Sequence, residues 1–168
     1  MKTEFNEEQK FTQWWLWLIL SGVSAIPLIG IYYQFILNEQ FGRKPIPDTG
    51  LIIFSLFVFM LIVMFWFIKL RTKIDENEIE MSFFPFVKKQ VLWDEIENAK
   101  IVNYGHVGGY GIRLGTKYGT VYNIKGKTGL AIKQKNGIQF LIGTQKESEL
   151  NNIIMNIIIK KGLYESES

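Results

Sequence analysis

The chain has 168 residues, 48% of them hydrophobic, and carries a formal net charge of +3. It contains no cysteine, which excludes disulfides, thiolate metal sites and cysteine nucleophiles. Its one histidine, His106, cannot form a site built from paired imidazoles. Almost all long apolar runs fall before residue 70 and short alternating patterns follow, so we expect two differently built parts.

Residues 1–13 are polar, and we expect them to form an N-terminal tail. Residues 14–36 are apolar and, at about 1.5 Å per residue, long enough to cross a bilayer core as a helix. Membrane helices tolerate small residues and proline where a neighbouring helix packs closely. We therefore expect a kink and a close helix–helix approach in the part of this span that contains Gly22, Ser24, Pro27 and Gly30.

A cleaved signal peptide is an alternative interpretation of this first span, with residues 23–25 as the small-x-small cleavage site. Such a peptide needs a positive region before its apolar core. The first ten residues instead carry three acids, Glu4, Glu7 and Glu8, against Lys2 and Lys10. We favour a retained helix.

Residues 51–68 contain no charge and are followed by Lys69, Arg71 and Lys73, the pattern of a second span with a basic stop signal. The loop at 37–50 carries fewer bases close to the spans. Cytoplasmic loops are enriched in Lys and Arg, so we expect a two-span protein of the cell (inner) membrane with its soluble domain in the cytoplasm.

Residues 69–162 alternate short strand patterns with turn signals and end in a helical pattern at 145–161. The dipeptide Asn136–Gly137 predicts a two-residue hairpin turn with positive φ at both positions. Thr144 and Glu147 form a capping-box pattern, and an apolar stripe follows at helical spacing: Leu150, Ile153, Ile154, Ile157 and Ile158. Residues 163–168 form a short tail.

The predicted fold class is therefore α+β: two transmembrane helices, then a small antiparallel β-barrel or sandwich covered by a C-terminal amphipathic helix. The second part resembles the bacterial pleckstrin-homology-like (PH-like) domains, particularly the membrane-anchored ones of unknown function. The stretches that carry this resemblance are Ile74–Ile79, Trp93–Ile96, Gly108–Arg113 and Asn136–Gln145. The resemblance implies the fold and no ligand. Eukaryotic relatives often bind phosphoinositides through a basic first hairpin loop, but the corresponding residues 75–78 here are acidic.

No pattern predicts catalysis, a metal or a cofactor. Glycines between 105 and 119 lack the strand-to-helix context of a phosphate loop, and we expect them in turns and bulges. Asp94, Glu95 and Glu97 form the densest carboxylate cluster, which we interpret as a solvated turn.

Residues 98–146 contain no acid, and this is the most informative charge pattern in the chain. Basic residues held close to an anionic leaflet are attracted to it by about 1 kcal/mol each. The candidates for a surface facing lipid or a partner are Arg113, Lys117, Lys125, Lys127, Lys133 and Lys135.

These patterns predict a non-enzymatic, membrane-anchored module that docks a protein partner or the lipid surface. The alternative is an accessory subunit that assembles with a larger membrane complex through its two helices. The expected partners are the bilayer and a protein. A homo-oligomer through the C-terminal helix is also compatible with the sequence, whereas no motif for nucleic acid is present.

Overall fold

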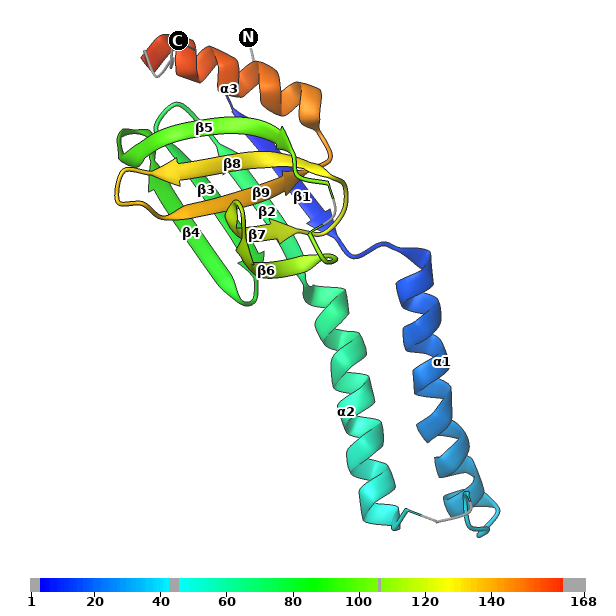
Figure 1. Ribbon diagram of the computed structural model, residues 1–168. Helices are drawn as coiled ribbons and strands as arrows, with labels where there is room; N and C mark the ends of the chain where they lie inside the picture. Colours follow the sequence, from blue (N-terminus) through cyan, green and yellow to red (C-terminus); the bar gives the residue numbers. More distant parts are fainter. Residues whose placement is uncertain (1–3, 43–45, 106, 162–168) are drawn as a thin grey trace. The chain divides into compact units, whose positions relative to one another are not determined.

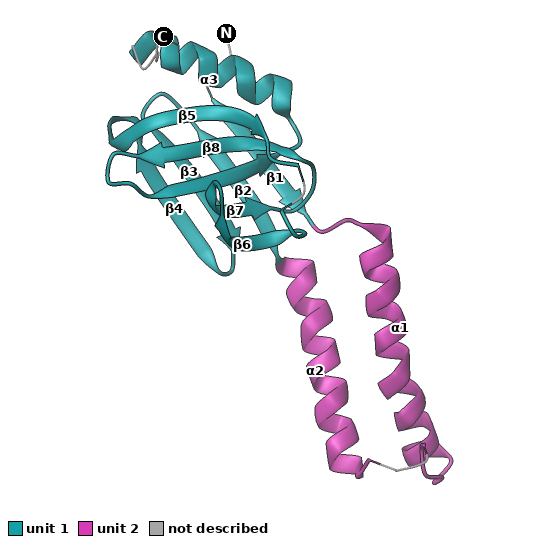
Figure 2. Ribbon diagram, viewed as in Figure 1, with its two compact units in different colours: residues 1–10, 68–168 teal, residues 11–67 magenta. Residues whose placement is uncertain are grey.

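The computed structural model describes residues 4–42, 46–105 and 107–161 (Figure 1). The chain forms two compact units (Figure 2). Unit 1 contains residues 1–10 and 68–168, and unit 2 contains residues 11–67. The chain thus contributes its first residues to unit 1, builds unit 2, and then returns to complete unit 1.

Unit 2 consists of two long apolar helices. α1 (Trp14–Ile31) continues into a π-helical turn, η1 (Tyr32–Ile36), and α2 (Asp48–Phe67) follows after a connection. Both are long and apolar enough to cross a membrane. α2 starts three residues before the predicted position, with Asp48 in its first turn, where a carboxylate interacts favourably with the helix dipole.

The two helices pack on each other through aromatic rings and a small residue. The rings of Trp17 and Trp66 meet edge to face, with centroids 5.7 Å apart. A Cβ placed on Gly30 would come within 2.9 Å of a methyl carbon of Leu51, whereas one on Gly22 would meet nothing within 4 Å. The predicted close approach is confirmed at Gly30 and is wrong at Gly22.

The N-terminal segment, expected as a polar tail, contains a strand of unit 1. β1 (Phe5–Lys10) pairs antiparallel along the whole of β2 (Lys69–Ile74). Its inward side chains, Phe5, Glu7 and Gln9, are all buried. The prediction of a tail was wrong because two of these three inward positions are polar, which hides the alternation that marks a strand.

Unit 1 contains two β-sheets. The first sheet has the order β1-β2-β3-β4, with β3 at Glu78–Phe84 and β4 at Val87–Leu92. A short 3₁₀ turn, η2 (Trp93–Glu95), leads to the second sheet. That sheet has the order β5-β8-β9-β7-β6, with the bounds Ile96–Asn103, Thr128–Gln134, Gln139–Thr144, Gly119–Asn123 and Gly111–Thr116.

The α+β class is confirmed. Of the two predicted arrangements, barrel or sandwich, the closed barrel is wrong, and the expectation of antiparallel strands throughout is also wrong. The described strands remain two separate sheets, and β7 runs parallel to β9. The parallel pair arises because the β8–β9 hairpin inserts β9 between β7 and β8, so consecutive strands β7 and β8 are not neighbours. Sequence patterns report strand positions and not their order in a sheet.

The core lies between the inner faces of the sheets. Phe83 of the first sheet meets Tyr122 of the second at 6.5 Å between ring centroids, and Tyr122 meets Phe140 at the same distance. At one edge, Trp93 is fully buried and its indole N–H donates a 2.7 Å hydrogen bond to the carbonyl of Asp75. These aromatic contacts join the two sheets into one unit.

The register of the first sheet defines two ends that matter for function. Lys10 pairs with Lys69, and Lys69 pairs with Phe84. We call this the entry end, because the chain passes into and out of unit 2 there. At the other end, the distal end, Glu78 pairs with Leu92.

Helix α3 (Glu147–Lys161) covers unit 1 beside β1 and β5 (Figure 1). Its predicted apolar stripe is confirmed, with four residues fully buried and Ile158 half-buried: Leu150, Ile153, Ile154 and Ile157. The predicted start at residue 145 is two residues early. Residues 162–168, including the predicted tail, lie outside the described part of the chain.

The predicted capping box is replaced by a contact with β1. The hydroxyl of Thr144 accepts a bond from the Lys146 N–H at 3.0 Å and donates to the carboxylate of Glu7 at 2.7 Å. The same carboxylate accepts the Gln145 N–H at 2.8 Å. A distant strand, and not a residue of the helix, therefore satisfies this turn.

The β8–β9 hairpin also differs from the prediction. Only Gly137 of the Asn136–Gly137 pair has positive φ, +85°. The Gly137 N–H donates to the carbonyl of Gln134, and the Asn136 side chain accepts from the Ile138 N–H. The loop is therefore four residues long, because the Asn136 side chain stabilises a turn that needs only one glycine.

Candidate interaction surfaces

The structure separates the predicted basic residues into different parts of unit 1. Lys117 lies in the β6–β7 turn, Lys133 in β8 and Lys135 in the β8–β9 turn. Lys125 and Lys127 lie in the β7–β8 connection, and Arg113 lies in β6. No single face of unit 1 holds all six, so the basic span of the sequence is not one surface.

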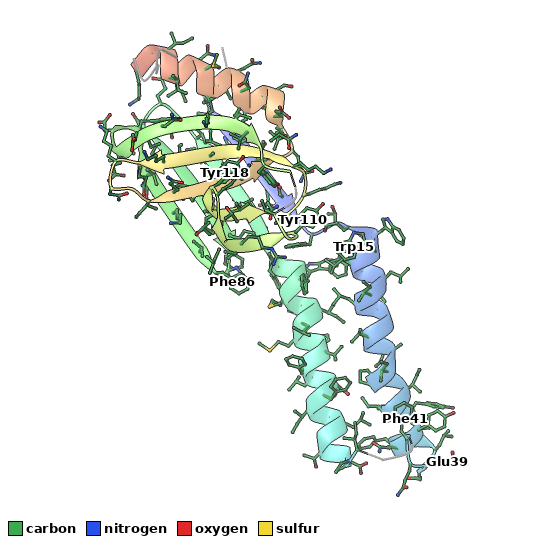
Figure 3. The ribbon with its side chains drawn as sticks, in the orientation of Figure 1. Trp15, Glu39, Phe41, Phe86, Tyr110 and Tyr118 are labelled. Carbon is green, nitrogen blue, oxygen red and sulfur yellow. The ribbon has the colours of Figure 1, made fainter. Side chains whose placement is uncertain are left out.

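One open groove on the outer face of the second sheet gathers lysines from three elements. It has a volume of about 260 Å³. Lys100 of β5, Lys117 and Lys133 line it together with Tyr118, which Figure 3 labels on this face. Asn98, Gln139, Ala131 and Ile132 complete the lining. We call this site the lysine groove. Lys100 belongs to the acid-free span but was not among the candidate residues.

The floor of the lysine groove is firmly packed. Val121 and Leu141 point to the outer face of the second sheet and are fully buried there. They form a small cluster with Tyr104, against which Tyr118 and Ala131 pack from the groove side. A packed aromatic and aliphatic floor fixes the strand positions from which the lysines extend.

The charges of the lysine groove are partly paired. The Lys133 ammonium lies 2.6 Å from a carboxylate oxygen of Glu97, and both side chains are about half exposed. The Lys117 ammonium lies 4.9 Å from the centre of the Tyr118 ring. Three lysines against one carboxylate leave the groove positive, with donors that suit a carboxylate or another anion.

The lysine groove lies towards the distal end of unit 1. The Lys135 N–H donates a 2.9 Å hydrogen bond to the carbonyl of Glu95, which places the β8–β9 turn beside η2. Lys133 pairs with Gln139 directly next to this turn. The β7–β8 connection, with Lys125 and Lys127, lies at the opposite end of β8, where Thr128 pairs with Thr144.

Arg113 of β6 bonds back to the connection that precedes its strand. Its guanidinium donates to the carbonyl of Tyr110 at 3.0 Å, and a Cβ on Gly109 would come within 2.5 Å of it. Gly109 has φ +121° and can approach this closely because it lacks a side chain. Arg113 thus holds the β5–β6 connection in place.

The same connection contains a buried tyrosine. The Tyr104 hydroxyl donates to the carbonyl of Gly126 at 3.1 Å and accepts from the Asn123 amide at 3.2 Å. Burial raises the pKa of Tyr104 above its ordinary value, although the Asn123 hydrogen bond opposes the shift. The predicted use of glycines in turns and bulges is confirmed here, since Gly105, Gly108 and Gly109 all have positive φ.

A second charged cluster lies at the entry end and was missed in the sequence. The carboxylate of Glu8 is hydrogen-bonded to Arg71 and lies 3.1 Å from the Lys10 ammonium and 3.9 Å from that of Lys69. The Arg71 hydrogen bond, followed by that of Lys10, lowers the pKa of Glu8. Three bases share one acid, so the entry end is positive. The bases were visible in the sequence, but their common partner on β1 was not.

The carboxylate cluster of the sequence spans η2, which contains Asp94 and Glu95, and the start of β5, which contains Glu97. Asp94, Glu95 and Glu97 are exposed, and the Glu95 carboxylate accepts the Leu92 N–H at 3.1 Å. Among the described residues, no group of three or more His, Cys, Asp or Glu side chains is placed to hold a metal ion. His106 lies outside the described residues.

No known protein family matches this chain, and no curated protein or solved structure is similar to it.

Proposed function

We propose that this chain is a non-enzymatic, membrane-anchored interaction module whose PH-like β-domain docks an acidic segment of a protein partner in the lysine groove. The observation that carries the proposal is the convergence of Lys100, Lys117 and Lys133 on one packed groove. In this reading, α1 and α2 cross the inner membrane and unit 1 lies on its cytoplasmic side.

The position of the lysine groove favours a protein over lipid as its partner. The chain enters the two helices from Lys10 and Lys69, so the bilayer lies next to the entry end. The lysine groove lies towards the distal end, beside η2. The groove is thus at the end of unit 1 away from both chain connections to α1 and α2, and we infer that a flexible acidic segment of a partner reaches it there.

A charge-reversal experiment on the full chain tests this function. The triple variant Lys100→Glu, Lys117→Glu, Lys133→Glu and the wild type are placed in nanodiscs of neutral lipid. Their binding to a fluorescent, glutamate-rich decapeptide is measured against salt concentration. Each exposed ion pair contributes about 0.5 kcal/mol or more, so loss of three should weaken binding by about 10-fold or more.

The matched control reverses Lys125 and Lys127, which lie outside the lysine groove. This double variant should bind the peptide nearly as the wild type does. An equal loss of peptide affinity in both variants would show non-specific charge attraction and contradict the lysine groove as the binding site. Absence of any binding by the wild type, with co-purification of other membrane proteins that depends only on α1 and α2, would favour an accessory subunit instead.

A further inference from the structure

The tip of the β3–β4 hairpin exposes two large aromatic side chains. β3 ends at Phe84 and β4 begins at Val87, and the Phe86 N–H donates a 2.8 Å hydrogen bond to the carbonyl of Phe83 to close the turn. Phe83 points inward and is buried. Phe84 and Phe86 remain 46% and 54% exposed. Figure 3 labels Phe86 at this tip.

This tip lies at the entry end of unit 1. Phe84 pairs with Lys69, and Lys69 follows the last residue of α2, Phe67, by only two positions. Paired strands lie about 5 Å apart and two extended residues span about 7 Å. Chain connectivity alone therefore keeps the backbone of Phe84 within about 12 Å of the end of α2. The headgroup region of each leaflet is about 5–8 Å thick, so the hairpin tip can reach it.

The charges around the tip suit an anionic interface. The Lys69 ammonium lies 5.9 Å from the centre of the Phe84 ring. Lys69, Lys10 and Arg71 share the single carboxylate of Glu8, so net positive charge surrounds the aromatic tip. Aromatic rings flanked by bases are the side chains that membrane interfaces favour.

We propose that Phe84 and Phe86 enter the lipid headgroup layer and form a third attachment of unit 1 to the bilayer, in addition to the two helices. The occupant of this apolar tip is the lipid interface and not a protein, because the pairing of Phe84 with Lys69 keeps the tip within reach of the headgroups and bases flank it. The attachment restricts the tilt of unit 1. It rests on the proposed membrane anchoring by α1 and α2, and it is independent of the lysine groove.

A fluorescence experiment on the full chain tests the attachment. The chain has no cysteine, so Phe86→Cys introduces a single site for an environment-sensitive nitrobenzoxadiazole label. The matched control is Ile138→Cys in the β8–β9 turn, where the native side chain is 49% exposed at the distal end. Both proteins are placed, one copy per disc, in nanodiscs that contain phosphatidylglycerol and lipids spin-labelled near the headgroup.

The label at position 86 should emit at shorter wavelength and be quenched several-fold more by the spin-labelled lipid than the label at position 138. A second variant pair carries the label at Ser82→Cys, once with the native tip and once with Phe84→Ser and Phe86→Ser added. The label should be several-fold more accessible to iodide in the protein that lacks the two aromatic side chains. Equal lipid quenching at positions 86 and 138 would overturn the attachment. A blue shift that occurs only with two copies per disc would assign the tip to a second copy of the chain instead.

The anchor itself is scored separately by alkaline carbonate extraction. If the protein resists extraction but the label at position 86 is not quenched, only the tip attachment is contradicted. If carbonate removes the protein from the membrane, the anchoring by α1 and α2 is contradicted, and the tip attachment with it. The lysine groove would remain testable by peptide binding in both cases.

Discussion

Two adjacent glutamates of β1 have opposite roles because strand alternation turns them to opposite faces. Glu7 is 8% exposed and its carboxylate accepts two hydrogen bonds, from Thr144 and from the Gln145 N–H. Glu8 points outward to three bases. The first residue connects β1 to the start of α3, and the second organises the charge of the entry end.

Glu7→Gln should lower the free energy of unfolding by about 1–3 kcal/mol, because an amide offers one acceptor oxygen where the carboxylate offers two, and one buried donor loses its partner. The measurement is chemical denaturation of the full chain in detergent micelles. The matched control, Glu8→Gln, replaces the neighbouring exposed residue and should cost no more than about 1 kcal/mol. Equal costs would mean that the Glu7 contact contributes nothing specific.

The contribution of Glu8 should depend on pH. Because Arg71 and Lys10 lower the pKa of Glu8 in the folded state, its stabilisation is present above the ordinary carboxyl pKa and is lost as pH falls through the lowered one. Solvent screening keeps its size to no more than about 1 kcal/mol. The difference in melting temperature between the wild type and Glu8→Gln should therefore be measurable at neutral pH and should shrink in acid. A difference that grows in acid would contradict the assignment.

At the scale of elements, the parallel pairing of β7 with β9 decides the shape of the second sheet. Gly119 begins β7, and a Cβ there would lie 2.0 Å from the carbonyl oxygen of Gln139. Gly115 has a similar positive φ, +69°, but nothing lies within 4 Å of the corresponding Cβ position. Comparing alanine substitutions at Gly115 and Gly119 therefore separates two free-energy costs, that of the backbone conformation and that of the close approach to Gln139.

Gly115→Ala should cost about 1–2 kcal/mol, the penalty of a left-handed conformation with a Cβ. Gly119→Ala should cost distinctly more, because the strand must also move away from Gln139. Denaturation of the full-length variants gives both values. Similar costs at the two positions would show that β7 and β9 are not held together at this point.

At the scale of the whole molecule, the pairing of β1 with β2 constrains the topology. Residues before α1 and after α2 belong to one sheet, so a chain whose two helices both cross the bilayer must have Asn6 and Ser148 on the same side. Removal of the first span as a signal peptide would also remove β1 and uncover the side chains against which Phe5 is buried. The sheet therefore supports a retained first span.

Single-cysteine labelling should show this topology, since the native chain has no competing thiol. Gln40→Cys, in the exposed connection between the helices, should react with a membrane-impermeant maleimide added outside intact cells. Asn6→Cys and Ser148→Cys should react only after the cells are opened. Labelling of Ser148→Cys from outside would reverse the orientation, and labelling of all three from one side would exclude two spans.

The local features of this protein could be predicted from the sequence. Two apolar segments of bilayer length, the strand series after residue 69 and the buried stripe of α3 each depend on hydropathy or periodicity within one window. Local turn chemistry was less decisive: the Asn136 side chain formed a longer loop than the dipeptide predicted. The uneven distribution of bases along the chain was visible in the sequence, but which of these bases lie close together in the fold was not.

By itself, the sequence determined that the chain contains two long apolar helices and, after them, a strand series and a final helix with an acid-free, basic middle. Tertiary structure decided that the N-terminal segment is a strand, because Gln9 and Glu7 are satisfied by Gly143 and Thr144, more than 130 positions away. It also decided which bases lie together: strand order brings Lys100, Lys117 and Lys133 to one groove and places Lys125 and Lys127 elsewhere. Pairing between distant strands sets both outcomes, and a pattern read along the chain does not contain it.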